Sequence, residues 1–354
     1  MISVIVCAYN EESHIEKCLL SLVSQNLDRS LFNILVIDNS SEDATYSIVH
    51  SFITKACPND VAIRLISIEH VDLSSSRNTG ILECNSPYIL FVDADAYVES
   101  DFLQNYFDAI NQNPLSDILH GPVLNSNNHD FTKFYFRAHM QASQKMSKTH
   151  SVIGANMMFK ASVFNYGYFF SELKRGDESG LIAHLEANGT YLKYTFVERA
   201  KVFNWYPSSL SGWYGIIFTE GSMRALIDYR ITRLTYFHVL RNLVLRLIMP
   251  ITVLFLCLYV MGVTYLSDKL FFGFSFVASL RLFFVRKYLS FGLTFQKSRT
   301  TLRTLFLICN FPTVFLLRDT GYVVGLLRLI FRRRVPCTVR TSKILSRVDG
   351  ANVE

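Results

Sequence analysis

The chain has 354 residues, half of them hydrophobic, and its mean hydropathy of +0.23 is high for a purely soluble protein. The formal net charge is +6, but residues 1–236 carry −7 and residues 237–354 carry +13. This basic surplus lies among apolar runs, which favours an anionic membrane surface and argues against nucleic acid as a partner. The seven cysteines show no CxxC spacing, which argues against a disulfide framework or a zinc site and suits a reducing cytosol.

Short apolar segments alternate with helical patterns through the first 90 or so residues. Strands are expected at residues 2–7, 33–37, 62–68 and 89–92. Helices are expected in three places: on an apolar face that includes Ile15 and Leu19, over residues 44–53, and from the start of the stretch RNTGILECN at residues 77–85. This alternation indicates an α/β domain with a mostly parallel sheet.

Polar residues follow these strands directly. Glu11 comes after the first strand, Asp38 after the second, and Asp93 and Asp95 after the fourth. Ligands of such sheets bind beyond the carboxyl ends of the strands, so these acids are expected at one edge. Residues i and i+2 of an extended segment point the same way, which would let Asp93 and Asp95 act on one ligand. Carboxylates repel one another unless a cation joins them, and this ligand set suits Mg²⁺ or Mn²⁺ held together with phosphates.

The last third of the chain contains candidate membrane segments. Residues 247–266 carry no charge, and a helix of that length spans about 30 Å, the thickness of a hydrocarbon core. A second apolar run at residues 270–285 would complete a transmembrane hairpin over 247–285, with Asp268 and Lys269 in its turn. Residues 206–246 are expected to form interfacial helices that join the hairpin to the first domain.

The segment after the hairpin, residues 286–354, is expected to hold a basic loop, re-entrant or interfacial helices, and a tail. Its apolar run at 305–317 is too short to span, and residues 318–334 have the pattern of an amphipathic helix at a lipid surface. The distribution of Lys and Arg predicts that residues 1–246, the 286–303 loop and the tail face the cytoplasm, across an inner or plasma membrane.

Six stretches occur in a characteristic order: VCAYNEES, VIDNSSEDAT, SSSRNTG, ILFVDADAYV, VIGANMMFK and RGDESGLIAHLEANG. Together they resemble the family 2 glycosyltransferases of the GT-A fold, over about residues 1–205. The resemblance implies a Rossmann-like catalytic domain. It also implies transfer of a sugar, with inversion at the anomeric carbon, from a nucleotide-diphosphate donor bound with a divalent metal.

The resemblance also implies roles for individual residues. Asp95 would be the direct metal ligand, and Asp93 would lie beside the ribose and the metal. The remaining donor contacts would come from Ala8, Tyr9, Glu11, Asp38 at the nucleobase, Arg77 near the nucleotide or its diphosphate, and Gly154 to Asn156 beside the donor sugar and acceptor. The family usually has a Glu-Asp pair whose Asp is the general base, whereas this chain has Asp177-Glu178. Register favours Glu178 as the base, with Asp177 as the alternative.

Plainer interpretations stay open at three of these positions. The Asp93/Asp95 pair could cap a strand end, Asp177-Glu178 could begin a solvated helix, and Arg77 could be a surface helix residue.

The function expected from the sequence is that of a membrane-anchored, cytosol-facing inverting glycosyltransferase with a lipid-linked or membrane acceptor. The QxxRW motif of processive synthases is absent from the sequence, which favours transfer of one sugar per encounter. Two alternatives stay open. One is a polyprenyl-phosphate sugar synthase, whose phosphate acceptor needs little help from a base. The other is a catalytically silent membrane scaffold of the same fold.

Overall fold

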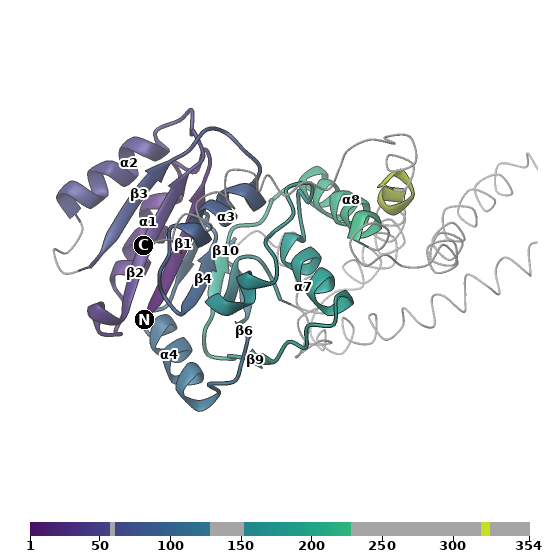
Figure 1. Cartoon of the computed structure of the whole chain (residues 1–354). Helices are drawn as coiled ribbons and strands as arrows, with labels where there is room; N and C mark the ends of the chain where they lie inside the picture. The colour runs from purple at the N-terminus through teal and green to yellow at the C-terminus, as the bar shows by residue number, and fades with distance from the viewer. Residues whose placement is uncertain (57–60, 128–151, 228–319, 326–354) are drawn as a thin grey trace, which may run out of the picture.

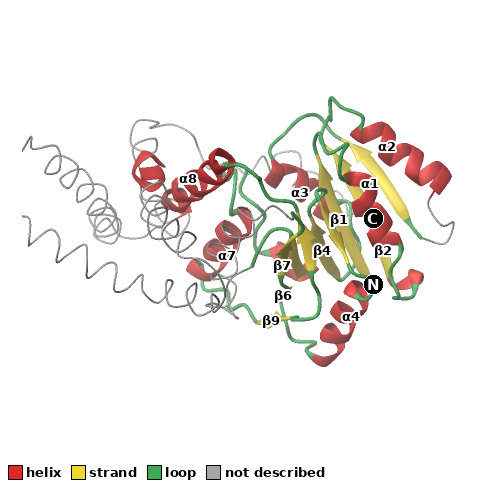
Figure 2. Ribbon diagram, turned by 180° about the vertical axis from the view of Figure 1, so that it is seen from behind, coloured by secondary structure: helices red, strands yellow, loops and turns green. Residues whose placement is uncertain are grey.

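The structure is a computed structural model that describes residues 1–56, 61–127, 152–227 and 320–325. Figures 1 and 2 show a central sheet with helices on both faces. The strands are β1 (Ile2–Ala8), β2 (Phe32–Asp38), β3 (Ile63–Ser67), β4 (Tyr88–Val92), β5 (Ala96–Val98), β6 (Ile118–His120), β7 (Val123–Asn125), β8 (Asn156–Lys160), β9 (Tyr194–Phe196) and β10 (Val202–Asn204). The helices are α1 (Ile15–Val23), α2 (Thr45–Ser51), α3 (Leu73–Leu82), α4 (Phe102–Gln112), α7 (Asp177–Ala187) and α8 (Leu210–Leu226).

The main sheet has seven strands in the order β3-β2-β1-β4-β8-β6-β9. The first four are parallel, as the sequence predicts. Strand β8 enters antiparallel between β4 and β6, so the sheet is mixed. A small second sheet, β5-β10-β7, lies beyond β4. The parallel half brings the ends of β1, β2 and β4 to one edge, which is where the polar residues follow.

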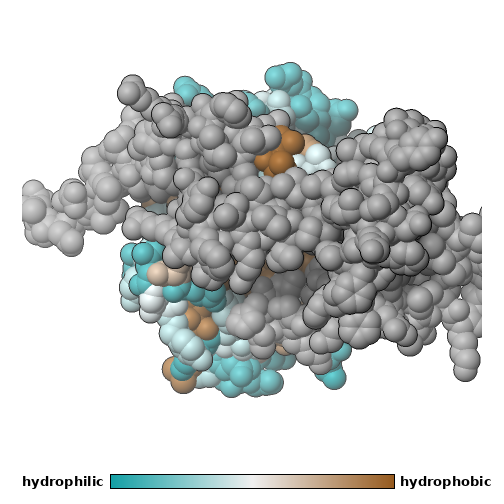
Figure 3. Space-filling view, turned by 90° about the vertical axis from the view of Figure 1, so that its right-hand side faces the viewer, coloured by the Kyte–Doolittle hydropathy of each residue, from teal (hydrophilic) through white to brown (hydrophobic). Residues whose placement is uncertain are grey.

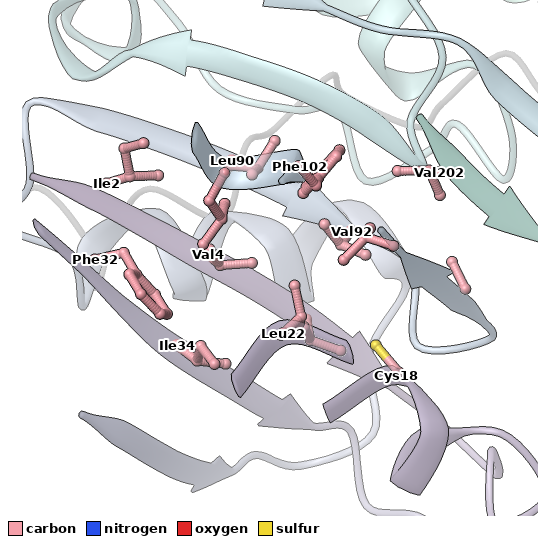
Figure 4. Packing of buried hydrophobic residues seen from close by; sticks show 14 of the residues in the cluster. Ile2, Val4, Cys18, Leu22, Phe32, Ile34, Leu90, Val92, Phe102 and Val202 are labelled. Carbon is pink, nitrogen blue, oxygen red and sulfur yellow. The ribbon is translucent and has the colours of Figure 1, made fainter. Parts of the chain in front are cut away.

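Alternate residues of the central strands build two apolar layers, as the pleat of a strand requires. Val4 and Val6 of β1 pack with α1, α2 and α4, whereas Ile5 packs with α3 and α7 on the opposite face. Figure 4 shows part of the first layer, in which Leu22 of α1 and Phe102 of α4 lie over β1 and β4. This burial on both faces explains why the strands are almost entirely apolar.

Three local expectations differ from the structure. Helix α3 begins at Leu73, ahead of Arg77, because the Asp72 side chain caps it by accepting a hydrogen bond from Ser75 N at 2.9 Å. The helix expected over 44–53 is α-helical only to Ser51 and continues as a π-helix, Phe52–Ala56. The Asp93–Asp95 segment is a tight turn closed by a 3.0 Å bond from Ala96 N to Asp93 O, so it is not extended.

Helix α8 occupies part of the segment that the sequence assigns to interfacial helices. Trp213 of α8 is fully buried, and Ser222 donates a 2.9 Å hydrogen bond to Gly321 O. A Cβ at Gly321 would lie 2.2 Å from Phe218 O, so glycine lets residues 320–325 pack closely against α8, with Tyr322 fully buried. This described part of the predicted amphipathic segment therefore contacts α8.

Within the described ranges, no helix combines the length and apolar character needed to cross a bilayer. The predicted hairpin at 247–285 and nearly all of the predicted segment 286–354 lie outside those ranges. On the face drawn in Figure 3, the described surface is largely hydrophilic with scattered apolar residues.

Candidate active site

Two loops, one after β1 and one after β2, are bonded to each other at the sheet edge. Glu11 N donates to Thr45 Oγ1 at 2.7 Å, and Glu42 N donates to Asn10 Oδ1 at 2.8 Å. Asn10 and Ser40 both have a φ of 55°, a left-handed conformation that costs free energy for residues with a Cβ. Reciprocal hydrogen bonds hold this strained backbone, so the loops are pre-organised around whatever they bind.

Asp38 ends β2 with its side chain almost fully buried, at 2 % exposure. Its Oδ2 accepts a long 3.4 Å bond from Ser67 Oγ, while Oδ1 has no hydrogen-bond partner among the described residues. Burying a carboxylate oxygen without a donor is costly, so this oxygen fits the N–H group of a ligand. The nearby rings of Tyr9 and His70 lie 4.4 Å apart, and both residues are exposed, so they can border a flat ligand.

Three carboxylates interact at the ends of β1 and β4. Asp93 and Asp95 are half-buried in their turn, and Glu11 is half-buried after β1. Burial, with the negative charges of Asp93 and Glu11, raises the pKa of Asp95 to about 8. Carboxylates that raise one another's pKa suit a divalent cation, which removes the repulsion.

The described residues contain no group of three or more His, Cys, Asp or Glu side chains placed to hold a metal ion together. A cation at the Asp93–Asp95 turn would therefore have to complete its oxygen shell from another source, as Mg²⁺ does with substrate phosphates. The site fits a metal that arrives with its ligand, and Asp95 and Asp93 are the residues that would hold it.

Arg77 is almost fully buried and joins this turn to α7. Its Nη1 donates to both carboxylate oxygens of Asp177, at 2.7 and 2.8 Å. Its Nη2 donates to Asp93 Oδ1 at 3.1 Å and to Gly154 O at 3.3 Å. The surface-residue interpretation of Arg77 is thus wrong. Both terminal nitrogens are used within the protein, so Arg77 is not free to clasp a diphosphate.

Asp177 and Glu178 begin α7 in different environments. Asp177 is 3 % exposed and bound to Arg77, which excludes the interpretation of a solvated helix start. Glu178 is half-buried, and burial together with the adjacent Asp177 holds its pKa well above the usual range for a glutamate. A raised pKa is expected of a group that must take a proton near neutral pH.

Two residues expected near the donor lie inside the fold. Ala8 is 1 % exposed and its carbonyl accepts a 2.9 Å bond from Asn39 N, which joins the ends of β1 and β2. Asn156 is fully buried: its Oδ1 accepts a 2.6 Å bond from the Tyr106 hydroxyl, and its Nδ2 bonds to the Pro122 and Ala200 carbonyls. Asn156 therefore has its amide committed to the framework beneath the site.

The structure also brings residues to the site that the motifs did not indicate. In the register of β5 and β10, Asn204 pairs with Ala96, so Trp205 follows at the level of Asp95. The Trp205 ring lies 5.3 Å from that of His14. The phenol of Tyr206 interacts with Asp93 and Asp95, and exposed Arg175 interacts with Asp95. The sequence gives only a weak signal that Arg175, Trp205 and Tyr206 belong to the site, because they come more than 75 positions after the DxD motif.

Residues 3–167 match the family model described as glycosyl transferase family 2, and this part of the chain belongs to that family. The chain is 30 % identical over 163 residues to a poly(ribitol-phosphate) beta-glucosyltransferase of Bacillus spizizenii, which covers 46 % of this chain and 25 % of that protein. It is 32 % identical over 104 residues to a dolichyl N-acetyl-alpha-D-glucosaminyl phosphate 3-beta-D-2,3-diacetamido-2,3-dideoxy-beta-D-glucuronosyltransferase of Methanococcus voltae, covering 29 % of this chain and 32 % of that protein.

The fold is similar to that of a mannosyltransferase from Pyrobaculum calidifontis, solved in complex with GDP-Man and Mn²⁺. The TM-score is 0.56 with 14 % identity, covering 94 % of this chain and 88 % of that one. The similarity supports a GT-A-like fold with a mixed sheet. The matched segments span only about a quarter to a third of the two curated relatives, so their activities do not transfer directly to this chain.

Proposed function

We propose that the protein is an inverting glycosyltransferase that moves one sugar from a nucleoside diphosphate donor to an acceptor hydroxyl, with the help of Mg²⁺ or Mn²⁺. The observation that carries this proposal is the group of three interacting carboxylates, Glu11, Asp93 and Asp95, at the carboxyl edge of the parallel strands. A nucleoside diphosphate with its metal supplies the positive charge and the phosphate oxygens that this group lacks.

The surroundings of Asp38 favour uracil as the nucleobase of the donor. The unpartnered Oδ1 of Asp38 can accept one N–H bond, while Oδ2 is already in contact with Ser67. Uracil offers a single imide N–H between two carbonyl groups, whereas guanine presents neighbouring N–H donors that are best met by both oxygens of a carboxylate. Tyr9 and His70 would border the ring of the base.

The leaving group is a nucleoside diphosphate whose negative charge grows as the glycosidic bond breaks. A bound divalent cation would supply Lewis-acid stabilisation of that charge. Among the chain's own residues, exposed Arg175 lies close enough to Asp95 to influence its charge and can add to the positive potential there. Asp93 is held in place by Arg77.

Glu178 is the residue proposed to take the proton from the acceptor hydroxyl. Asp177 is bound through both oxygens to Arg77, which leaves it poorly placed to accept a proton from a substrate. Glu178 follows it on α7, is half-buried, and has a raised pKa. A base on the face opposite the leaving group gives inversion, and it contributes about 10²–10⁴-fold to the rate.

The acceptor is proposed to be lipid-linked, and the protein to be an integral membrane protein with this domain on the cytoplasmic side. The charge-free run at 247–266 and the net +13 of residues 237–354 support that proposal. The name of the M. voltae relative refers to a dolichyl phosphate glycan, which is a lipid-linked acceptor.

The donor is tested by a thermal-shift screen of nucleotide sugars with and without Mn²⁺. Binding to the native state raises the melting temperature by mass action. We expect uridine diphosphate sugars to raise it in a Mn²⁺-dependent manner, and guanosine diphosphate sugars to do so less. A protein that binds no nucleotide sugar under any of these conditions would instead be a silent scaffold of the same fold.

The base is tested with Glu178→Gln, which keeps size and hydrogen bonding but cannot take a proton. Donor binding should survive, and turnover at saturating donor and acceptor should fall about 10²–10⁴-fold. If both Glu178→Gln and Asp177→Asn turned over like wild type, the acceptor would already be ionised. The protein would then be a polyprenyl-phosphate sugar synthase.

A further inference from the structure

The Arg77 guanidinium touches both halves of the proposed site. It comes from α3, and it contacts Asp93 in the metal-binding turn, Gly154 before β8, and Asp177 at the first residue of α7. Its Cζ lies 5.8 Å from the ring centroids of both Phe91 and Phe169. Hydrogen bonds and aromatic contacts together fix the guanidinium in position.

Neither member of the Arg77–Asp177 pair is free for solvent or substrate, since each is 3 % exposed. Ser74 Oγ lies 3.4 Å from the second carboxylate oxygen of Asp177 and so adds a further contact from α3. A buried charge that lost its partner would be strongly disfavoured, so α7 cannot leave this position without breaking the pair. The start of α7 is thereby tied to α3 and to the turn that holds Asp93.

We propose that Arg77 and Asp177 act as a positioning pair. The pair fixes the position of Glu178 relative to the Asp93–Asp95 turn, so that the proposed base and the donor are both correctly placed for the acceptor. This inference rests on the proposed function, because it assigns a task to the surroundings of the proposed base. It also accounts for the Asp-Glu order: the shorter side chain reaches the buried guanidinium, and the longer one next to it stays available for the acceptor.

Gly154 provides an independent way to disturb this pair. A Cβ at this position would lie 2.9 Å from Arg77 Nη2 and 3.2 Å from Nη1. Alanine there must push the guanidinium aside, yet it removes no charge and no hydrogen-bonding group. Gly154→Ala therefore tests the position of Arg77, whereas Asp177→Asn tests its charge pairing.

The experiment measures turnover at saturating substrates, the Kd for a UDP-sugar with Mn²⁺, and the pH dependence of kcat. Misplacing a catalytic group by about 1 Å can cost about 10²-fold, so kcat should fall about 10- to 100-fold in Asp177→Asn and in Gly154→Ala, with a much smaller rise in Kd. The controls are Asp108→Asn, at an exposed carboxylate on α4, and Gly215→Ala, where an added Cβ meets nothing within 4 Å. Both controls should behave like wild type.

The pH profile separates positioning from proton transfer. If Asp177 only positions Glu178, its Asn variant loses rate but keeps a rise of kcat with pH. That rise moves to lower pH, because the charge of Asp177 no longer raises the pKa of Glu178. Glu178→Gln loses the rise altogether. If Glu178→Gln instead kept the rise of kcat with pH, Asp177 would be the base, and the inference would be overturned. Gly154→Ala with wild-type kcat would overturn it as well.

Hydrogen exchange gives a readout that does not need the transfer reaction and keeps the inference testable if Asp177→Asn folds poorly. Binding of UDP-sugar and Mn²⁺ should slow exchange at the first turn of α7 in the wild type, and less so in Gly154→Ala. If ligand binding slowed exchange equally in both proteins, the positioning role would be contradicted, but the proposed function would stand. A wild type that binds no donor would overturn the proposed function, and the inference with it.

Discussion

Asp177 and Glu178 are neighbours in the chain, yet the structure gives them different chemistry. Asp177 accepts two charge-assisted bonds from Arg77, whereas the charge of Glu178 is disfavoured by burial and by Asp177 itself. Arg77 offsets part of this effect, since its positive charge lowers the pKa of Glu178. At the scale of single residues, the partner of each carboxylate decides between anchoring and proton transfer.

The raised pKa of Glu178 predicts the pH dependence of turnover. Glu178 must be unprotonated to accept a proton, and burial with Asp177 keeps it protonated to a higher pH than an ordinary glutamate. Turnover should therefore be lost as the pH falls through a pKa well above the usual glutamate value, and should rise to a plateau above it. Measuring kcat at saturating substrates across pH 5–9 tests this prediction; a constant kcat down to about pH 5 would contradict it.

Asp38 is expected to contribute to the affinity for the donor. Asp38→Asn keeps the shape of the side chain but replaces a charged acceptor with a neutral one. A hydrogen bond to a charged group contributes about 1.5–3 kcal/mol, so Kd for the UDP-sugar should rise about 10- to 150-fold. Calorimetry measures this change, with Asp101→Asn as the control because Asp101 makes no capping side-chain bond at the start of α4. Equal affinity in wild type and Asp38→Asn would place the nucleobase elsewhere.

At the scale of elements, the apolar runs predict the central parallel strands β1, β2 and β4 well, because side chains on both faces of these strands are buried and few of them are polar. The direction of β8 could not be read in this way, since an apolar run such as Met157–Phe159 looks the same in either direction. The motif that begins at Arg77 does not reveal the start of α3 at Leu73, because the capping residue, Asp72, lies ahead of that motif.

In the candidate site, too, local sequence patterns predict some residues, whereas contacts between distant parts of the chain cannot be predicted from them. Asp38, Asp93 and Asp95 were predicted together because each follows a strand that the sequence marks clearly. The contact between Arg77 and Asp177 joins residues 100 positions apart, and no local pattern encodes such a pairing. Asn156 looked like a site residue because it belongs to a motif, yet its amide serves the framework.

The contact between α4 and β8 predicts an effect on stability. Tyr106 is fully buried, and burial raises the pKa of its phenol well above the ordinary value, so it keeps its proton and donates to Asn156 Oδ1 at 2.6 Å. Tyr106→Phe leaves that buried oxygen without its donor, which should lower the free energy of unfolding by about 1–3 kcal/mol. Kd for the donor should be unchanged. Urea unfolding measures the loss, and exposed Tyr166→Phe is the control, expected within about 0.5 kcal/mol of wild type.

At the scale of the whole molecule, the first two thirds and the last third of the sequence carry opposite net charge. Residues 1–236 are acidic overall, and the candidate site within them is itself rich in carboxylates. Residues 237–354 are basic and contain the charge-free run. This charge distribution would favour contact of the last third of the chain, and not of the first two thirds, with an anionic lipid surface, as the proposed membrane attachment requires.

The distribution of Lys and Arg along the last third of the chain predicts the membrane topology. Lys and Arg are retained on the cytoplasmic side of a bilayer, and they flank both ends of the 247–285 segment. A reporter enzyme fused after residue 246 or after residue 303 should therefore be active on the cytoplasmic side, and one inserted at Asp268 should be active on the opposite side.

Replacing Arg286 and Lys287 with Gln should weaken the orientation of the second span and lower the signal contrast between the 268 and 303 fusions. A cytoplasmic signal at 268 in the otherwise unaltered chain would show that both apolar runs lie in the membrane interface. The protein would then reach its acceptor from the surface of the bilayer without crossing it.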